Sequence, residues 1–160
     1  MTTTPVPLTM KCISVRVPWT WYLMYAGKDI ENRGRTFPRQ WRGRVLLQAS
    51  NWWNQEEIRC DIEDANRMWA KNHIRAEGAP ELTLQHLDET RGHVIGTVEF
   101  ADYVFESDSS WFVGDLGIVI RNPLPFDRPI RLKGNRGLFN VDVSSSDFQE
   151  QLLPAFSLAA

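Results

Sequence analysis

Residues 27–33 read GKDIENR, and they place an ammonium, a carboxylate and a guanidinium within a few positions of one another. In an extended segment Glu31 and Arg33 lie on one face, and Lys28 lies at the bend that precedes it. A lysine supplies a mobile charge or, when desolvated, an amine of lowered pKa, and an arginine supplies a planar fork for phosphate. From spacing alone, a surface ion-pair cluster is the simpler interpretation and a ligand site is the alternative.

The sequence on both sides of this stretch predicts an α+β fold. A short helix is expected between Pro18 and Gly27, because a proline at the first helical position loses no hydrogen bond and a glycine commonly ends a helix. A longer helix is expected over 55–72, where Asn54 is a candidate cap and apolar residues recur every three or four positions. Residues 76–92 are interrupted by glycine and proline, and they predict a loop, with one helical turn within it as an alternative.

Five or six strands are expected from runs of alternating or β-branched residues. These runs cover residues 11–17, 44–50, 93–105, 115–120, 129–132 and 138–143. Asn122, Pro123 and Pro125 predict a break in the chain after the fourth run. Few helices are interleaved between the later strands, so a small mixed or antiparallel barrel with flanking helices fits better than a doubly wound sheet.

Length and composition predict one cytoplasmic domain. A chain of 160 residues can bury roughly 70% of its unfolded surface, enough for a core of its own. No apolar run approaches the ~20 residues that span a bilayer, and the N-terminus lacks the pattern of a signal peptide. Residues 1–9 are expected to form a flexible leader, and residues 144–160 a tail with a short helix. The two cysteines and three histidines have no metal-ligand spacing, so we expect no metal and no cofactor, and the oligomeric state is left open.

Charge is distributed unevenly along the chain. The net charge is −2, which argues against tight unspecific binding to DNA. However, 11 of the 18 lysines and arginines fall in residues 28–44 and 121–136, whereas residues 56–115 carry 14 acidic and 5 basic side chains. We expect the two basic segments to converge on one face at the mouth of a cleft, with the acidic helix 55–72 behind it.

Several short motifs recur in an order that is typical of one protein family. Pro18-Trp19 is followed by Gly27-Lys28-x-x-Glu31-x-Arg33. This resembles the GxKxxExR signature of ASCH domains, which are relatives of the PUA RNA-binding fold. Residues 41–45 (WRGRV) and 92–99 (GHVIGTVE) are similar to two strand segments of that family. Further motifs follow in family order at Trp111, Gly117, Asn122-Pro123, Lys133-Gly134 and Gly137-Leu138-Phe139. The resemblance covers residues 10–143, which it identifies as an ASCH domain.

This resemblance implies a small PUA-like β-barrel with a cleft beside residues 27–33. ASCH domains are thought to bind RNA or other nucleic acid. Some are enzymes: one removes the acyl group of N4-acetylcytidine with a lysine, a threonine and a glutamate, and another is a ribonuclease. The lysine carries over to Lys28, the position of the threonine holds Glu31, and Glu99 is a candidate for the acid. Glu99 lies in an apolar strand, so we expect it to be exposed or bonded to a cation of the cleft.

The first functional hypothesis is a module that binds RNA, single-stranded nucleic acid or a nucleotide-like small molecule. Basic side chains would contact phosphate, and the bases would stack on Trp19, Trp41, Trp52 or Trp53. The candidate ligand-binding residues are Trp19, Lys28, Glu31, Arg33, Trp41, Arg42, Arg44, Ser50, Glu99 and Lys133.

Two further hypotheses remain open from the sequence. The chain could be a hydrolase that acts on RNA or a modified nucleoside, with Lys28 as an activated amine or oxyanion partner and Glu31 as general acid or base. It could instead be a protein-interaction module without catalysis, which would use the acidic helix 55–72.

Overall fold

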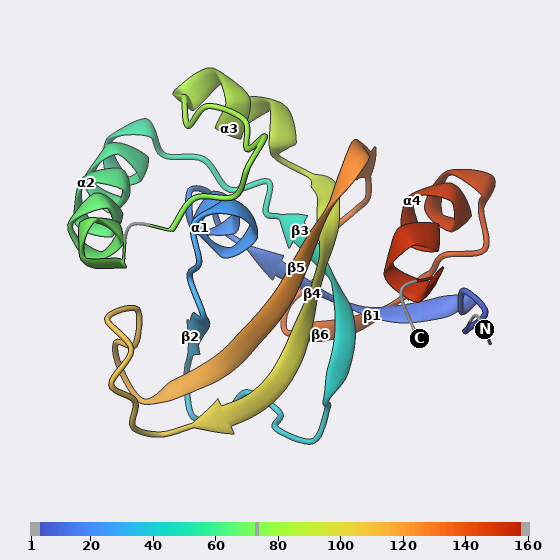
Figure 1. The fold of residues 1–160 in the computed structure, drawn as a ribbon, viewed down its shortest axis with the longest axis horizontal. Coiled ribbons are helices and arrows are strands. Elements are labelled where there is room, and N and C mark those ends of the chain that lie inside the picture. The colour runs from blue at the N-terminus through green and yellow to red at the C-terminus, as the bar shows by residue number, and fades with distance from the viewer. Residues whose placement is uncertain (1–3, 73, 158–160) are drawn as a thin grey trace.

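Residues 4–72 and 74–157 are described by a computed structural model, which has an α+β fold of six strands and four helices (Figure 1). The strands are β1 (Thr9–Val15), β2 (Ile30–Arg33), β3 (Gly43–Ala49), β4 (His93–Val104), β5 (Leu116–Arg131) and β6 (Leu138–Asp142). The helices are α1 (Trp19–Tyr25), α2 (Gln55–Asn72), α3 (Leu84–Thr90) and α4 (Ser146–Ser157). The predicted class is confirmed. The number of strands also agrees, but β2 was not among the predicted runs, and the runs 115–120 and 129–132 lie along one strand, β5.

The strands form one mixed sheet in the order β2-β5-β4-β3-β1-β6. Only β1 and β3 pair in parallel among the described strands, and the other neighbours are antiparallel. The long strands β4 and β5 run together as a twisted ribbon through the middle of the molecule (Figure 1). The sheet is curled, so that β2 approaches β1 although the two strands are not neighbours in it. Arg33 at the end of β2 donates to the carbonyl oxygen of Ser14 in β1 at 3.0 Å. The pairings of the described residues leave β2 and β6 as edges, so these hydrogen bonds do not close the sheet into a barrel.

Strand β5 is continuous where the sequence predicts a break. Glu99 pairs with Arg121 and Thr97 pairs with the residue after Pro123, so Asn122 and Pro123 both lie opposite one residue of β4. This is a β-bulge, and a bulge accommodates a proline that the regular ladder excludes. A larger irregularity follows, in which residues 126–129 lie opposite Ile95. The prediction of two separate strands is therefore wrong, because the pairing with β4 resumes after each irregularity.

The helices follow local signals to different degrees. Helix α2 has the predicted bounds, and Asn54 caps it by accepting a hydrogen bond from the backbone of Glu57 at 3.1 Å. Helix α3 lies where a loop was predicted, and Thr83 caps it by accepting from the backbone of His86 at 3.0 Å. The glycine and proline residues upstream of Thr83 obscured this short helix, although Thr83 is an ordinary N-cap residue.

Two apolar clusters lie on the two sides of the sheet. The larger one packs α1 and α2 against the sheet, and the smaller one packs α4 against residues such as Cys12 and Leu46. Leu152 of α4 is fully buried in the smaller cluster. Gln149 donates to the carbonyl oxygen of Pro7 at 3.0 Å, so the chain before β1 is bonded to α4 at the side where both ends lie (Figure 1).

No helix of the described chain combines the length and the apolar character that crossing a bilayer requires.

Candidate ligand-binding cleft

A cleft of about 820 Å³ lies where β2 curls back toward β1. Six of the residues singled out from the sequence line it: Trp19, Lys28, Glu31, Arg33, Ser50 and Trp52. Asn32 of the same segment also lines it, and other lining residues come from distant parts of the chain, among them Met68, Trp111 and Arg136. The cleft is therefore assembled from the segment 28–34, from residues 14–19 before it, and from elements that follow it much later in sequence.

Lys28 is buried in the wall of this cleft, with only 4% of the residue exposed. Its Nζ atom lies 5.7 Å from the ring centre of Trp19 and 5.9 Å from that of Trp111, and it donates to the carbonyl oxygen of Ile30. Burial lowers the pKa of Lys28 below its ordinary value, although the nearby carboxylate of Glu31 opposes the shift. An amine held between two aromatic faces is a cation–π arrangement, which favours the ammonium form to a smaller degree.

Glu31 and Arg33 lie on the same side of β2, two residues apart, as the alternation of a strand predicts. Glu31 is 8% exposed, and its Oε2 atom has no hydrogen-bond partner among the described residues. The guanidinium of Arg33 donates to Ser14 from Nη2, whereas its Nε atom also has no partner in the described chain. A buried polar group left unpaired costs about 1–3 kcal/mol, so each such atom calls for an explanation, and a ligand that pairs with it is one.

Trp111 forms another part of the wall and is 2% exposed. Its indole Nε1 is a third buried polar atom without a partner among the described residues. The loop that carries Trp111 is held by the segment 29–32. Asn32 donates from Nδ2 to the carbonyl oxygen of Trp111 at 2.9 Å and accepts from the backbone of Val113 at 2.9 Å, while Ser109 donates to Asp29 at 2.5 Å.

Sequence reasoning singled out neither Trp111 as a wall residue nor Asn32 as the residue that positions it. Trp111 appears in the sequence only as one motif of the family pattern. The available signal for Asn32 is a polar side chain between two charged ones in a short strand. Its partner loop lies about 80 positions away, so the contact depends on the β2–β5 pairing.

The rim of the cleft is formed partly by α2 and by a stacked arginine. The guanidinium carbon of Arg16 lies 4.1 Å from the ring centre of Trp52, and Met68 of α2 lines the same cleft. Burial and the neighbouring carboxylates raise the pKa of Asp61 in α2, while Arg16 opposes this shift. The acidic helix therefore lies at the rim and not behind the cleft, because the packing of its apolar face against α1 brings it to this edge.

A second groove of about 610 Å³ adjoins the cleft and is lined by Lys133 and the residues around it. Arg33 and Arg136 line the cleft together, so the two basic segments meet in part. They do not converge along their whole length, because Trp41 and Arg42 lie elsewhere.

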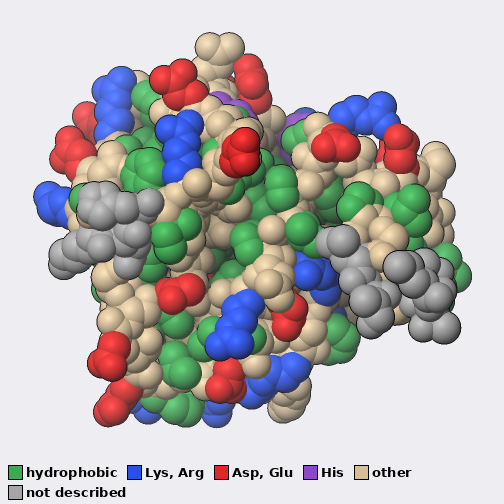
Figure 2. All heavy atoms as spheres, in the orientation of Figure 1, with side chains coloured by type: hydrophobic (Ala, Val, Ile, Leu, Met, Phe, Trp, Pro, Cys, Tyr) green, Lys and Arg blue, Asp and Glu red, His purple; other side chains and the backbone are tan. Residues whose placement is uncertain are grey.

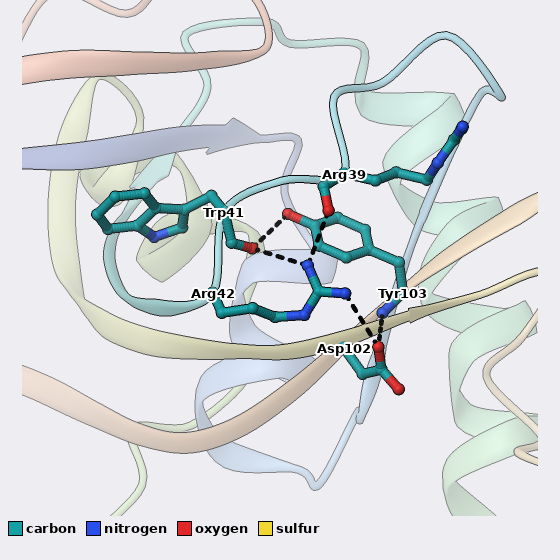
Figure 3. Close-up of polar contacts among 5 residues, drawn as sticks. All are labelled: Arg39, Trp41, Arg42, Asp102 and Tyr103. Carbon is teal, nitrogen blue, oxygen red and sulfur yellow. Dashed lines mark hydrogen bonds and ion pairs between the residues drawn. The ribbon is translucent and has the colours of Figure 1, made fainter.

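Trp41 and Arg42 belong to a separate cluster near the end of β4 (Figure 3). Arg42 donates to the carbonyl oxygen of Arg39 at 2.8 Å and to the carboxylate of Asp102 at 3.2 Å, and Tyr103 donates to the carbonyl oxygen of Trp41 at 2.8 Å. These contacts hold the loop between β2 and β3 against β4.

Arg44 and Glu99 also lie outside the cleft. They are direct partners across β3 and β4. Arg44 donates to Thr97 at 2.9 Å, and Glu99 accepts from Asn122 at 2.9 Å. Glu99 is therefore half-buried and bonded to its strand neighbours, neither in open solvent nor next to a cation of the cleft.

Comparison with known proteins gives a match in the solved structures alone: no family model and no curated protein matches the chain. The matching structures include an ASCH protein from Zymomonas mobilis and two of its point mutants. The first covers 90% of this chain and 93% of its own, with 14% sequence identity and a TM-score of 0.47. One mutant covers 90% and 96%, at 14% identity and a TM-score of 0.44, and the other covers 92% and 96%, at 15% identity and a TM-score of 0.40. The chain is thus similar to ASCH structures over about nine-tenths of its length, at low sequence identity.

The side chains of the cleft offer hydrogen-bonding and stacking groups more than metal ligands. No three His, Cys, Asp or Glu side chains within residues 4–72 and 74–157 gather as a metal would require. The residues that line the cleft include the carboxylate of Glu31, the guanidinium of Arg33, the indole of Trp111 and the amine of Lys28, and the first three each have one buried polar atom without a partner among the described residues. Flat aromatic faces stand beside them at Trp19 and Trp52.

Proposed function

We propose that the cleft binds a nucleobase, carried by single-stranded RNA or by a nucleotide. The observation that supports this most is that one buried unpaired acceptor, Glu31 Oε2, and two buried unpaired donors, Arg33 Nε and Trp111 Nε1, belong to residues that line one cleft. The edge of a nucleobase carries donors and acceptors side by side, and its faces stack on aromatic rings and guanidinium planes. The curled sheet would serve as the wall of a PUA-like barrel in this role.

Each side chain has a definite part in this proposal. Glu31 accepts from an amino or imino group of the base, and Arg33 and Trp111 donate to a carbonyl or ring nitrogen. The amine of Lys28 lies near the carboxylate of Glu31 and balances its charge. Because these groups are buried, a ligand that fails to pair with them leaves them unpaired, and this penalty gives selectivity among bases. Trp41, Arg42, Arg44 and Glu99 would be reached only by nucleotides beyond the one in the cleft.

The proposal is tested by titrating a short single-stranded RNA and the four nucleoside monophosphates into wild type, Glu31→Gln and Arg33→Ala. Loss of one hydrogen bond to a charged group costs about 1.5–3 kcal/mol, so we expect affinity to fall by roughly 10-fold to 150-fold in each variant. Arg128→Ala serves as the control, since Arg128 is exposed and paired with Glu150 outside the cleft. Wild-type affinity in both cleft variants, with unchanged melting, would refute the proposed site.

A hydrolase is the second candidate, and the burial of Lys28 beside an unpaired carboxylate oxygen favours it. In an amide hydrolysis, Glu31 would take a proton from the attacking water, Lys28 would stabilise the charge that develops on the carbonyl oxygen, and Glu31 would return the proton to the leaving amine. Incubation with an N4-acylated cytidine or with RNA, followed by chromatography, tests this. Turnover that is lost in Lys28→Arg while nucleoside binding persists would support catalysis, and absence of any product with wild type would exclude it for these substrates.

A further inference from the structure

The second groove adjoins the cleft and shares part of its lining. Its floor and sides come from the end of β3, the start of β4 and the loop 131–136. The residues shared by the two hollows are Ser14, Ser50, Trp52, Asn135 and Arg136. A ligand larger than a base would therefore reach from one hollow to the other past these shared residues.

This groove is lined by three cations and no carboxylate: Arg131, Lys133 and Arg136 all border it. None of the three takes part in an ion pair with another described residue, whereas Arg35, Arg42, Arg67, Arg91 and Arg128 each have an acidic partner. Three exposed cations around one hollow without a neutralising partner create a positive potential there, which attracts an anion.

The loop that carries these cations is fixed at its base. Gln48 is 1% exposed and donates from its amide to the carbonyl oxygen of Leu132, and the backbone of Leu132 donates to Gly92 at 2.9 Å. Gly134 lies so close that a Cβ atom on it would stand 2.6 Å from Oε1 of Gln48. The backbone of the loop therefore packs against the buried side chain of Gln48, while its basic side chains are exposed.

We propose, resting on the nucleobase function above, that this groove receives a phosphate group of the ligand. The ligand class is then a nucleotide or a nucleotide unit of RNA, and not a free base or nucleoside. Arginine offers parallel N–H groups that match phosphate oxygens, and lysine adds a point charge. In this proposal the base lies between Glu31 and Trp111, and its sugar and phosphate extend toward Arg136, which lines both hollows.

The test compares a nucleoside, its 5′- and 3′-monophosphates, and a short RNA with the same base. The groove variant is the double substitution Arg131→Met with Lys133→Met, because both residues border the groove but not the cleft. The charge-matched control is Arg67→Met with Arg128→Met, since both side chains are exposed and ion-paired elsewhere. We expect at least one monophosphate to bind wild type roughly tenfold or more tightly than the nucleoside. The groove variant should lose this advantage and keep the nucleoside affinity, and the control should retain both.

The outcomes separate the two proposals. If only the RNA binds wild type more tightly than the nucleoside does, the groove takes a phosphate within a chain, which also supports the inference. Equal affinity of nucleoside, monophosphates and RNA for wild type would overturn the groove inference and leave the nucleobase site standing. An equal loss in the control would also overturn it, because the effect would then come from net charge. Failure of all of these ligands to bind would remove both proposals.

Discussion

At the scale of single residues, Lys28 makes a prediction about pH. Its pKa is lowered by burial in the folded protein but is ordinary in the unfolded chain. Between these two values the unfolded chain binds more protons, so the free energy of unfolding contributed by Lys28 rises as the pH rises toward the ordinary lysine pKa. Lys28→Met lacks this pH-dependent contribution to the free energy of unfolding. We expect the difference in melting temperature, wild type minus Lys28→Met, to increase from neutral pH toward pH of about 10.

The control for this pH series is Lys133→Met, since Lys133 is exposed. Its melting temperature should run parallel to that of wild type. Parallel curves for Lys28→Met as well would mean that the amine of Lys28 titrates in the folded protein as it does in the unfolded chain.

Gly96 of β4 carries a second prediction at this scale. A Cβ atom there would stand 2.3 Å from the carbonyl oxygen of Leu124 and 2.8 Å from the Cα atom of Pro125, and backbone atoms cannot move aside easily. Gly96→Ala should therefore lower the free energy of unfolding by about 1–3 kcal/mol or more, measured by urea denaturation. Gly34→Ala is the matched control, because nothing lies within 4 Å of its added Cβ atom. A wild-type midpoint for Gly96→Ala would show that β4 and β5 are less tightly packed than described.

The sequence predicts some residues of the cleft better than others. Lys28, Glu31 and Arg33 follow from a bend and a two-residue period, which are local properties of the chain. Trp111 enters the cleft through a strand pairing with a partner far away in sequence, and no local pattern specifies which tryptophan that is.

At the scale of elements, the contact between β2 and the loop 109–113 gives a prediction. Asn32 holds this loop with two hydrogen bonds, one of them from the backbone N–H of Val113. In Asn32→Ala the loop loses both, so the amide of Val113 should exchange with solvent faster and ligand affinity should fall, because Trp111 is no longer positioned. Hydrogen exchange measured by NMR tests this. Asn140→Ala, at an exposed position of β6, is the control, and unchanged protection at Val113 in Asn32→Ala would contradict the account.

Elements with strong local signals are those that the sequence predicts well. Helix α2 has both a cap and an apolar period, and its bounds agree with the prediction. Strand β5 and helix α3 differ from the prediction because proline and glycine were interpreted as breaks. The β4 strand supplies hydrogen bonds on both sides of the bulge, so tertiary pairing overrides the local preference for a turn.

At the scale of the whole molecule, the two apolar clusters predict that stability and binding can be separated. Leu152 of α4 is fully buried in the smaller cluster, while its neighbour Leu153 is 58% exposed. Leu152→Ala should lower the free energy of unfolding by about 2–5 kcal/mol and leave the affinity of the cleft unchanged at temperatures where the protein is folded. Leu153→Ala should change neither. Calorimetry and ligand titration on both variants check this, and a loss of affinity in folded Leu152→Ala would indicate coupling across the sheet.

The distribution of charge over the surface also needs the whole fold. Basic side chains are spread over the visible face with acidic ones between them (Figure 2). The sequence counts arginines but does not specify their partners. Arg42 pairs with Asp102 of β4 and lies outside the cleft. Arg136 has no such partner among the described residues, and it lines the cleft. Convergence of the basic segments therefore depends on pairings that only tertiary structure supplies.

The central claim is that the cleft beside Lys28, Glu31 and Arg33 receives a nucleobase. A crystal structure of the protein with a bound nucleoside monophosphate tests it most directly. The account predicts electron density for the base in this cleft, with a donor of the base within hydrogen-bonding distance of Glu31 and an acceptor near Arg33 or Trp111. Density for the nucleotide at another surface, such as the cluster of Trp41 and Arg42, with none in the cleft, would contradict the account.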